Sequence, residues 1–183
     1  MKYIVDSYGV PSSRFRKPGF QSLLRIIIGQ QVSVSAGESI WKNFNTQIID
    51  VSPRKILKLS PAHLRKCGLS RQKVDYIYSL SNCLIDGSLD LDSLSVMSDA
   101  DAISELTRVK GIGEWTAQIY LMFSLARKDI WPNGDLALSN SVKLLFRLDH
   151  RPKGEKLLEI AEQWKPRRTA ASMLLWHYYH NVV

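Results

Sequence analysis

The carboxylate of Asp135 is the first candidate for chemistry in this sequence. Asp135 follows the turn formers Pro132 and Gly134, and an apolar series with helical spacing follows it. The pattern predicts a helix N-cap, which is also the ordinary meaning of an aspartate at such a position. Backbone N–H groups and the helix dipole there favour an ionised carboxylate, which can stabilise a positively charged sugar or orient water. Cleavage of a glycosidic bond needs such a group because its transition state resembles an oxocarbenium ion.

A glycine-containing turn within Val109–Ala117 is the second candidate. Gly111 and Gly113 flank Ile112, and apolar residues with helical spacing lie on both sides of the turn, so a tight hairpin between two helices is predicted. Amides of the turn and of the first turn of the second helix can point at a phosphate oxygen, which holds DNA without reading its sequence. The alternative is a helix stop followed by an ordinary turn between two helices.

A single carboxylate limits the substrates that Asp135 can serve. Protein glycosidases generally use a second carboxyl group to protonate a poor leaving group. An alkylated purine already carries positive charge and departs as a neutral base, so one anionic residue suffices.

The composition permits a polyanionic partner. The 183 residues include 25 Lys plus Arg against 17 Asp plus Glu, a formal charge of +8, although many soluble proteins are basic without binding nucleic acid. The start of the chain, Met1–Asp6, lacks the layout of a signal peptide, and the apolar run Ile26–Ile28 is too short to span a bilayer. We expect no membrane partner and an intracellular protein, cytoplasmic in a prokaryote or nuclear in a eukaryote.

Cysteine and histidine offer little for a metal site. Cys67 and Cys83 lack the paired spacing of a zinc or iron–sulfur site, and reduced structural thiols are expected. His177 and His180 are one helical turn apart, but no third ligand group accompanies them.

The elements that must position these residues are predicted to be helices only. Helical spacing and capping residues predict helices over the following ranges: 20–29, 34–44, 61–67, 71–86, 99–109, 115–125, 136–148, 153–164 and 167–179. No alternating strand pattern competes. The expectation is an all-α protein of two closely packed helical lobes.

Three separated motifs resemble the DNA-3-methyladenine glycosylase II family, the alkylated-base branch of the helix-hairpin-helix DNA glycosylases. The first runs from Phe20 to Ser33 and ends in a G-Q-Q-V-S turn. The second is the hairpin with Asp135, and the third is the W-K-P-R-R segment from Trp164 to Trp176. The resemblance implies the fold of that superfamily, with an active-site cleft between the lobes, and a single glycosylase domain over residues 1–183 without an additional N-terminal α/β domain.

The resemblance also implies roles for individual residues. Asp135 becomes the catalytic aspartate. Three aromatic side chains match the pocket that receives an extruded base: Trp115, Trp176 and Phe20. The implied DNA-binding residues come from the hairpin and from the turn that enters the gap left by the base: Gln30, Gln31, Lys110, Gly111, Ile112, Gly113 and Thr116. Core packing is the alternative for the tryptophans, and an exposed polar helix end is the alternative for the glutamines.

Trp115 bears on the type of reaction. Bifunctional relatives place a nucleophilic lysine at this hairpin-helix position to form a Schiff base, which tryptophan cannot do. Lys110 precedes the hairpin and suits a phosphate contact better than attack on the sugar. A glycosylase without lyase activity is therefore implied.

The resemblance implies no required cofactor. Its hairpins can hold Na⁺ or K⁺ through backbone carbonyls, which here belong to Thr107, Val109 and Ile112. The four-cysteine cluster of the iron–sulfur relatives is missing, so no such cluster is expected. The expected partner is double-stranded DNA containing alkylated bases, bound by a monomer.

The leading hypothesis is thus hydrolysis of the N-glycosidic bond of alkylated purines, such as 3-methyladenine or 7-methylguanine, during base excision repair. One alternative is a non-catalytic helix-hairpin-helix module that binds damaged DNA. Another is a related glycosylase that acts on a different damaged base.

Overall fold

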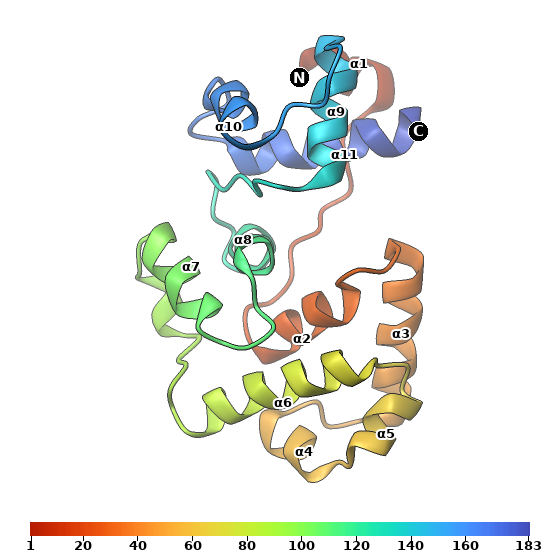
Figure 1. Cartoon of the computed structure of the whole chain (residues 1–183), viewed down its shortest axis with the longest axis vertical. Helices are drawn as coiled ribbons and strands as arrows, with labels where there is room; N and C mark the ends of the chain where they lie inside the picture. The colour runs from red at the N-terminus through yellow and green to blue at the C-terminus, as the bar shows by residue number, and fades with distance from the viewer. The chain divides into compact units, whose positions relative to one another are not determined.

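Helices are the only regular elements of the chain. The computed structural model describes residues 1–183 and contains eleven α-helices and one short 3-10 helix (Figure 1). The chain divides into two compact units, and each is described by itself. The central unit is Arg16–Tyr120, and the terminal unit combines Met1–Phe15 with Leu121–Val183. No helix has the length and apolar character that a membrane crossing requires.

The central unit is organised around α6, which packs against α2, α4 and α5, while α3 packs against α2. α2 buries seven of its ten residues, so it forms the middle of this core. The elements of the unit, including the last helix that continues past Tyr120, are α2 (Phe20–Gly29), α3 (Val34–Gln47), α4 (Pro53–Lys58), α5 (Pro61–Lys66), α6 (Arg71–Ile85), η1 (Ser93–Ser95), α7 (Asp99–Thr107) and α8 (Glu114–Phe123).

Serine caps fix where several of these helices begin. The hydroxyls of Ser60, Ser70 and Ser98 each accept the N–H of the residue three positions later, as the sequence predicts. At α7 the Ser98 hydroxyl also donates to the Asp101 carboxylate at 2.6 Å. The helix before the hairpin therefore has a defined start.

The terminal unit is built on the long helix α11, which packs against α9 and α1. Its elements are α1 (Lys2–Tyr8), α9 (Leu136–Phe146), α10 (Gly154–Glu162) and α11 (Arg168–Val182). The Ser141 hydroxyl of α9 donates to the Leu175 carbonyl of α11 at 2.7 Å, which ties the two helices together. His177 lies 2.8 Å from the Tyr8 carbonyl, so this histidine joins α11 to the end of α1.

The segment that leads toward Asp135 is anchored to the start of α11. The Arg168 guanidinium donates to both carboxylate oxygens of Asp129, each at 2.8 Å. Thr169 donates to the Arg127 carbonyl at 2.7 Å and accepts the Ile130 N–H at 3.1 Å. Arg168 and Thr169 therefore hold the chain that precedes the α9 N-terminus.

Candidate active site and nucleic-acid interface

Asp135 is the N-cap of α9, as its sequence context predicts. Its Oδ1 accepts the Leu138 N–H at 2.8 Å and the indole N–H of Trp176 at 3.0 Å. The first donor belongs to the first turn of α9 and the second to α11, so two helices fix the orientation of one carboxylate. Such a fixed anion can stabilise positive charge without reorganising during a reaction.

Trp176 is buried, with 5% of its surface exposed. Phe123 packs near the indole, with ring centroids 6.0 Å apart and planes at 38°. The guanidinium carbon of Arg14 lies 5.8 Å from the centroid of the same indole. Trp176 therefore positions Asp135 through its N–H, and its predicted stacking on an extruded base stays a prediction.

The hairpin between α7 and α8 uses its two glycines differently. Gly111 has φ +93°, and a Cβ at this position would lie 2.1 Å from Cγ of Tyr76. Only glycine fits there, because α6 places an aromatic ring against the turn. Gly113 has no left-handed φ, and a Cβ there would meet no atom within 4 Å. Gly111 is thus required by the fold of the hairpin, whereas Gly113 leaves open space beside it.

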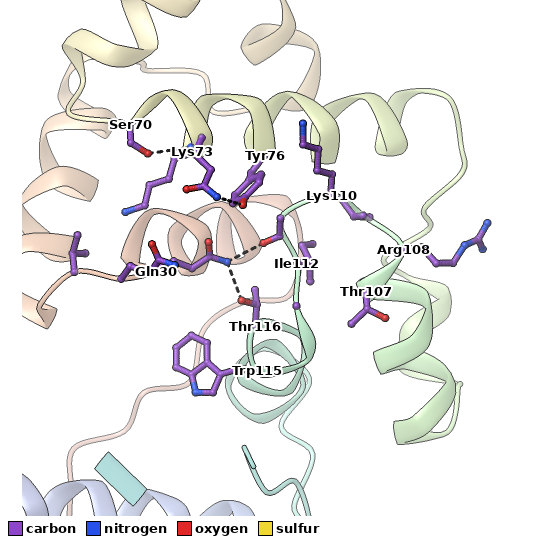
Figure 2. Close-up of a pocket in the computed structure, with 16 residues that line it drawn as sticks. Gln30, Ser70, Lys73, Tyr76, Thr107, Arg108, Lys110, Ile112, Trp115 and Thr116 are labelled. Carbon is purple, nitrogen blue, oxygen red and sulfur yellow. Dashed lines mark hydrogen bonds between the residues drawn. The ribbon is translucent and has the colours of Figure 1, made fainter. Parts of the chain in front are cut away.

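A cavity of about 750 Å³ lies over the hairpin, entirely within the central unit (Figure 2). Its lining includes Trp115 and all nine residues that the sequence assigned to DNA binding and to the cation site: Gln30, Gln31, Thr107, Val109, Lys110, Gly111, Ile112, Gly113 and Thr116. Ile112 is 3% exposed, so its side chain is buried beneath this surface. The structure brings the hairpin and the G-Q-Q turn into one surface.

Gln30 joins those two parts of the surface. Its side-chain amide donates to the Gly111 carbonyl and to the Thr116 hydroxyl, both at 2.9 Å, as Figure 2 shows. Thr116 is 4% exposed, so its hydroxyl serves this internal contact. The amide of Gln30 is therefore engaged inside the protein, and direct contact of either side chain with DNA stays a prediction.

Gln31 is exposed and has the unusual backbone angle φ 55°. A left-handed conformation costs energy for a residue with a side chain, and such strain is concentrated at functional sites. Nearby, Lys73 of α6 donates to the Ile28 carbonyl at 2.7 Å, and burial lowers the pKa of its ammonium group. Lys73 therefore stabilises the end of α2 from which the glutamine turn leaves.

The remaining predicted aromatic residues have distinct environments. Trp115 lines the cavity over the hairpin and is 37% exposed, which suits a ring that contacts a ligand better than one packed in the core. Phe20 is buried and lines a separate cavity of about 560 Å³ in the central unit. Phe20 and Trp115 therefore line different cavities, and the role of Phe20 in a base pocket stays a prediction.

The predicted cation ligands lie at the last residue of α7 and in the turn that follows it. The Val109 carbonyl accepts the Ile112 N–H at 3.0 Å, which closes the turn and still leaves that oxygen a second lone pair. Backbone carbonyls of this kind suit a hard monovalent cation. No cluster of three His, Cys, Asp or Glu side chains suited to another metal is present.

Sequence reasoning missed four residues that shape these surfaces: Arg14, Lys73, Tyr76 and Asp129. A glycine at position 111 indicates that another group can pack closely against the backbone there. The sequence does not show that this group is the side chain of Tyr76. Arg14 lies in a segment without periodic pattern, so no sequence signal connects it to Asp135.

The sequence matches HhH-GPD, the superfamily of base excision DNA repair proteins, over residues 24–167. This range contains the G-Q-Q turn, the hairpin and Asp135. The chain belongs to the HhH-GPD superfamily. The helical fold expected from the resemblance is thereby confirmed.

Relatives in this superfamily include DNA-3-methyladenine glycosylase 1 of Schizosaccharomyces pombe, which is 32% identical over 179 residues. That alignment covers 94% of this chain and 78% of the relative. DNA-3-methyladenine glycosylase of Bacillus subtilis is 29% identical over 169 residues, covering 86% of this chain and 56% of the relative. The chain therefore spans little more than half the length of some curated relatives.

Solved structures agree with the fold. The S. pombe 3-methyladenine DNA glycosylase in complex with abasic DNA superposes with a TM-score of 0.86 at 31% identity. The comparison covers 96% of this chain and 88% of the solved one. Helix-hairpin-helix architecture thus extends over nearly the whole chain.

Proposed function

We propose that this chain is a DNA glycosylase that hydrolyses the N-glycosidic bond of alkylated purines in duplex DNA, as a step of base excision repair. The observation that carries the proposal is the Asp135 carboxylate, held by N–H donors from two helices in a chain of the HhH-GPD superfamily. The names of the relatives, DNA-3-methyladenine glycosylases from yeast and bacteria, support the same substrate class.

The proposed reaction follows from the charges involved. In 3-methyladenine or 7-methylguanine nucleotides the base is cationic, so the C1′–N bond breaks with its electron pair passing to the base, which leaves neutral. The deoxyribose becomes oxocarbenium-like, and the Asp135 carboxylate stabilises this positive charge. Water then adds to C1′ and loses a proton to the solvent. The products are a free base and an abasic site.

We further propose that the protein has no lyase activity. A lyase forms a covalent imine with the opened sugar through a nucleophilic amine. Trp115 lies where bifunctional relatives are expected to carry lysine, and α8 contains no lysine along its length. The side chain of Lys110 belongs to the turn before α8 and suits a phosphate contact.

The hairpin surface supplies the proposed DNA contact. Gly113 leaves room for a phosphate, and the amides at the start of α8 lack acceptors within the helix. We propose that the exposed Gln31 enters the duplex where a base has left. A monovalent cation on the carbonyls of Thr107, Val109 and Ile112 would add positive charge beneath the phosphate. Replacing K⁺ by choline at equal ionic strength should then weaken DNA binding.

The deciding experiment compares base release by the unaltered protein and by Asp135→Asn. Asparagine retains an N-cap acceptor, so we expect a similar unfolding temperature and DNA affinity with release slowed by about 10²-fold or more. The control is Asp149→Asn, which removes the same charge from an exposed position of the same unit. Full activity of Asp135→Asn would contradict the mechanism.

Substrate panels separate this proposal from its rivals. Duplexes with single alkylated, deaminated or oxidised bases are incubated with the protein, and both free base and strand breaks are measured. Release of another base alone indicates a related glycosylase, and salt-dependent binding with no release indicates a DNA-binding module. Strand breaks that form without added alkali would refute the absence of lyase activity. We also propose that the protein acts inside the cell as a monomer, which sedimentation with and without DNA tests.

A further inference from the structure

Arg14 covers the indole that holds the proposed catalytic carboxylate. Its guanidinium carbon is 5.8 Å from the Trp176 ring centroid, and the Trp176 N–H donates to Asp135 Oδ1 at 3.0 Å. All three residues belong to the terminal unit. A permanent cation is therefore built into the group of residues that surrounds the carboxylate.

The electrostatic surroundings of Arg14 connect it directly to Asp135. Burial lowers the pKa of the Arg14 guanidinium, and the charge of Asp135 opposes that change. A guanidinium stays protonated throughout the physiological range, so the site keeps its positive charge. Partial burial weakens solvent screening and makes this charge felt by neighbouring groups.

We propose that Arg14 is a specificity-determining residue of the Asp135 site, which sets the relative rates at which cationic and neutral purines are released. The inference rests on the proposed glycosylase function. It goes beyond that function because it assigns the preference among substrates to one side chain outside the family's motifs.

A cationic purine meets two disadvantages from Arg14. The guanidinium occupies a π face of Trp176 to which a positively charged ring would otherwise be attracted. Its charge also repels the cationic base in the ground state. Since 7-methylguanine leaves as a neutral molecule, its departure gains little from a nearby cation.

A neutral purine such as hypoxanthine gains from the same group. When its C1′–N bond breaks, the electron pair makes the departing base anionic until a proton from water completes the neutral product. The guanidinium offers a positive charge and several N–H donors to the oxygen and nitrogen atoms of that base. Arg14 is thus expected to favour neutral leaving bases relative to cationic ones.

The test measures single-turnover release of 7-methylguanine and of hypoxanthine from otherwise identical duplexes. The protein is in excess of DNA but below its dissociation constant, so that the rate contains both binding and bond cleavage. Arg14→Gln removes the charge and keeps a polar side chain, whereas Arg14→Lys retains the charge. Arg65→Gln, at an exposed position of α5, controls for the general loss of one positive charge. Thermal unfolding of each variant is recorded in parallel.

We expect Arg14→Gln to raise the ratio of the 7-methylguanine release rate to the hypoxanthine release rate roughly tenfold. A partly buried cation beside the base is expected to change the relative rates of the two reactions by about this factor. Arg14→Lys and Arg65→Gln should keep the ratio of the unaltered protein. An unchanged ratio in Arg14→Gln, or an equal loss on both substrates, would overturn the role of Arg14. Release of 7-methylguanine with no hypoxanthine by the unaltered protein would also overturn it. Release of neither base, nor of any other alkylated purine, would instead refute the proposed function and with it this inference.

Discussion

Alanine substitutions at Gly111 and Gly113 should affect different properties, although the two residues lie two positions apart in the same turn. The first should reduce stability and the second should reduce DNA affinity. At Gly111 a Cβ would lie 2.1 Å from the Tyr76 ring, and φ is +93°. The left-handed backbone costs alanine about 1–2 kcal/mol, and overpacking costs about 1–3 kcal/mol more. Gly111→Ala should therefore destabilise the protein by about 2–5 kcal/mol, which lowers the unfolding temperature by roughly 5–15 °C at this chain length.

At Gly113 the same methyl group meets nothing within 4 Å and needs no left-handed angle. The free energy of unfolding should change by less than about 1 kcal/mol. The methyl group points into the space proposed for a phosphate, so DNA affinity should fall about tenfold, equivalent to about 1.4 kcal/mol. The salt dependence of binding should weaken at the same time, because one phosphate contact is lost.

Urea unfolding and fluorescence anisotropy with a short duplex measure the two effects separately. Adding Tyr76→Ala to Gly111→Ala should recover part of the lost stability, because it removes the overlap with the ring. The Cβ of residue 76 still lies 2.6 Å from the added Cβ, and the strained backbone angle remains, so the recovery is incomplete. The reasoning is refuted if Gly113→Ala is destabilised as much as Gly111→Ala. It is equally refuted if Gly113→Ala folds normally and binds DNA with unchanged affinity.

Three further substitutions test the supports of the proposed sites. Gln30→Ala removes two hydrogen bonds between the end of α2 and the α8 side of the hairpin and should lower the free energy of unfolding, measured in urea, by about 1–3 kcal/mol. Gln31→Ala should leave the free energy of unfolding unchanged and weaken only DNA binding. Equal destabilisation by the two substitutions would contradict this distinction. Burial raises the pKa of Asp129, but the hydrogen bonds and charge of Arg168 outweigh it and hold the pKa below its ordinary value of 3.8. The stability from this pair is therefore present above pH 3.8 and lost as the pH falls through the lower folded-state pKa. Asp129→Asn should be less stable at neutral pH, and the difference should shrink in acid; a constant difference would argue against the pair.

Strong periodic patterns predicted the helices well. Phe20–Gly29 appears with the predicted bounds, because its apolar residues, the glycine at its end and the following Gln30-Gln31 turn all agree. The short helices α1 and α4 were not predicted, since neither is long enough to show a repeat. Their formation depends on packing against α11 and α6, which local sequence does not encode.

The candidate site was predictable only where the type of a residue and its immediate neighbours indicate the local backbone structure. Asp135 followed by a helical pattern predicts an N-cap, and two glycines around one apolar residue predict a turn. The need for glycine at position 111 arises from Tyr76, which lies 35 positions away along the chain. The contact of Arg14 with Trp176 likewise joins segments far apart in sequence. Such pairings are decided by tertiary packing, so no local pattern reveals them.

The two hydrogen bonds from Gln30 have a consequence for the thermodynamics of DNA binding. They connect the end of α2 to the hairpin before any ligand arrives, so the two segments cannot move independently. A duplex that binds the end of α2 and the hairpin together would meet a surface that is already ordered. The conformational entropy of these two segments is therefore lost during folding and not during DNA binding. Transplanting the hairpin alone onto another helical protein should therefore transfer only part of its affinity for DNA, because the transplanted turn would lack the two hydrogen bonds from Gln30.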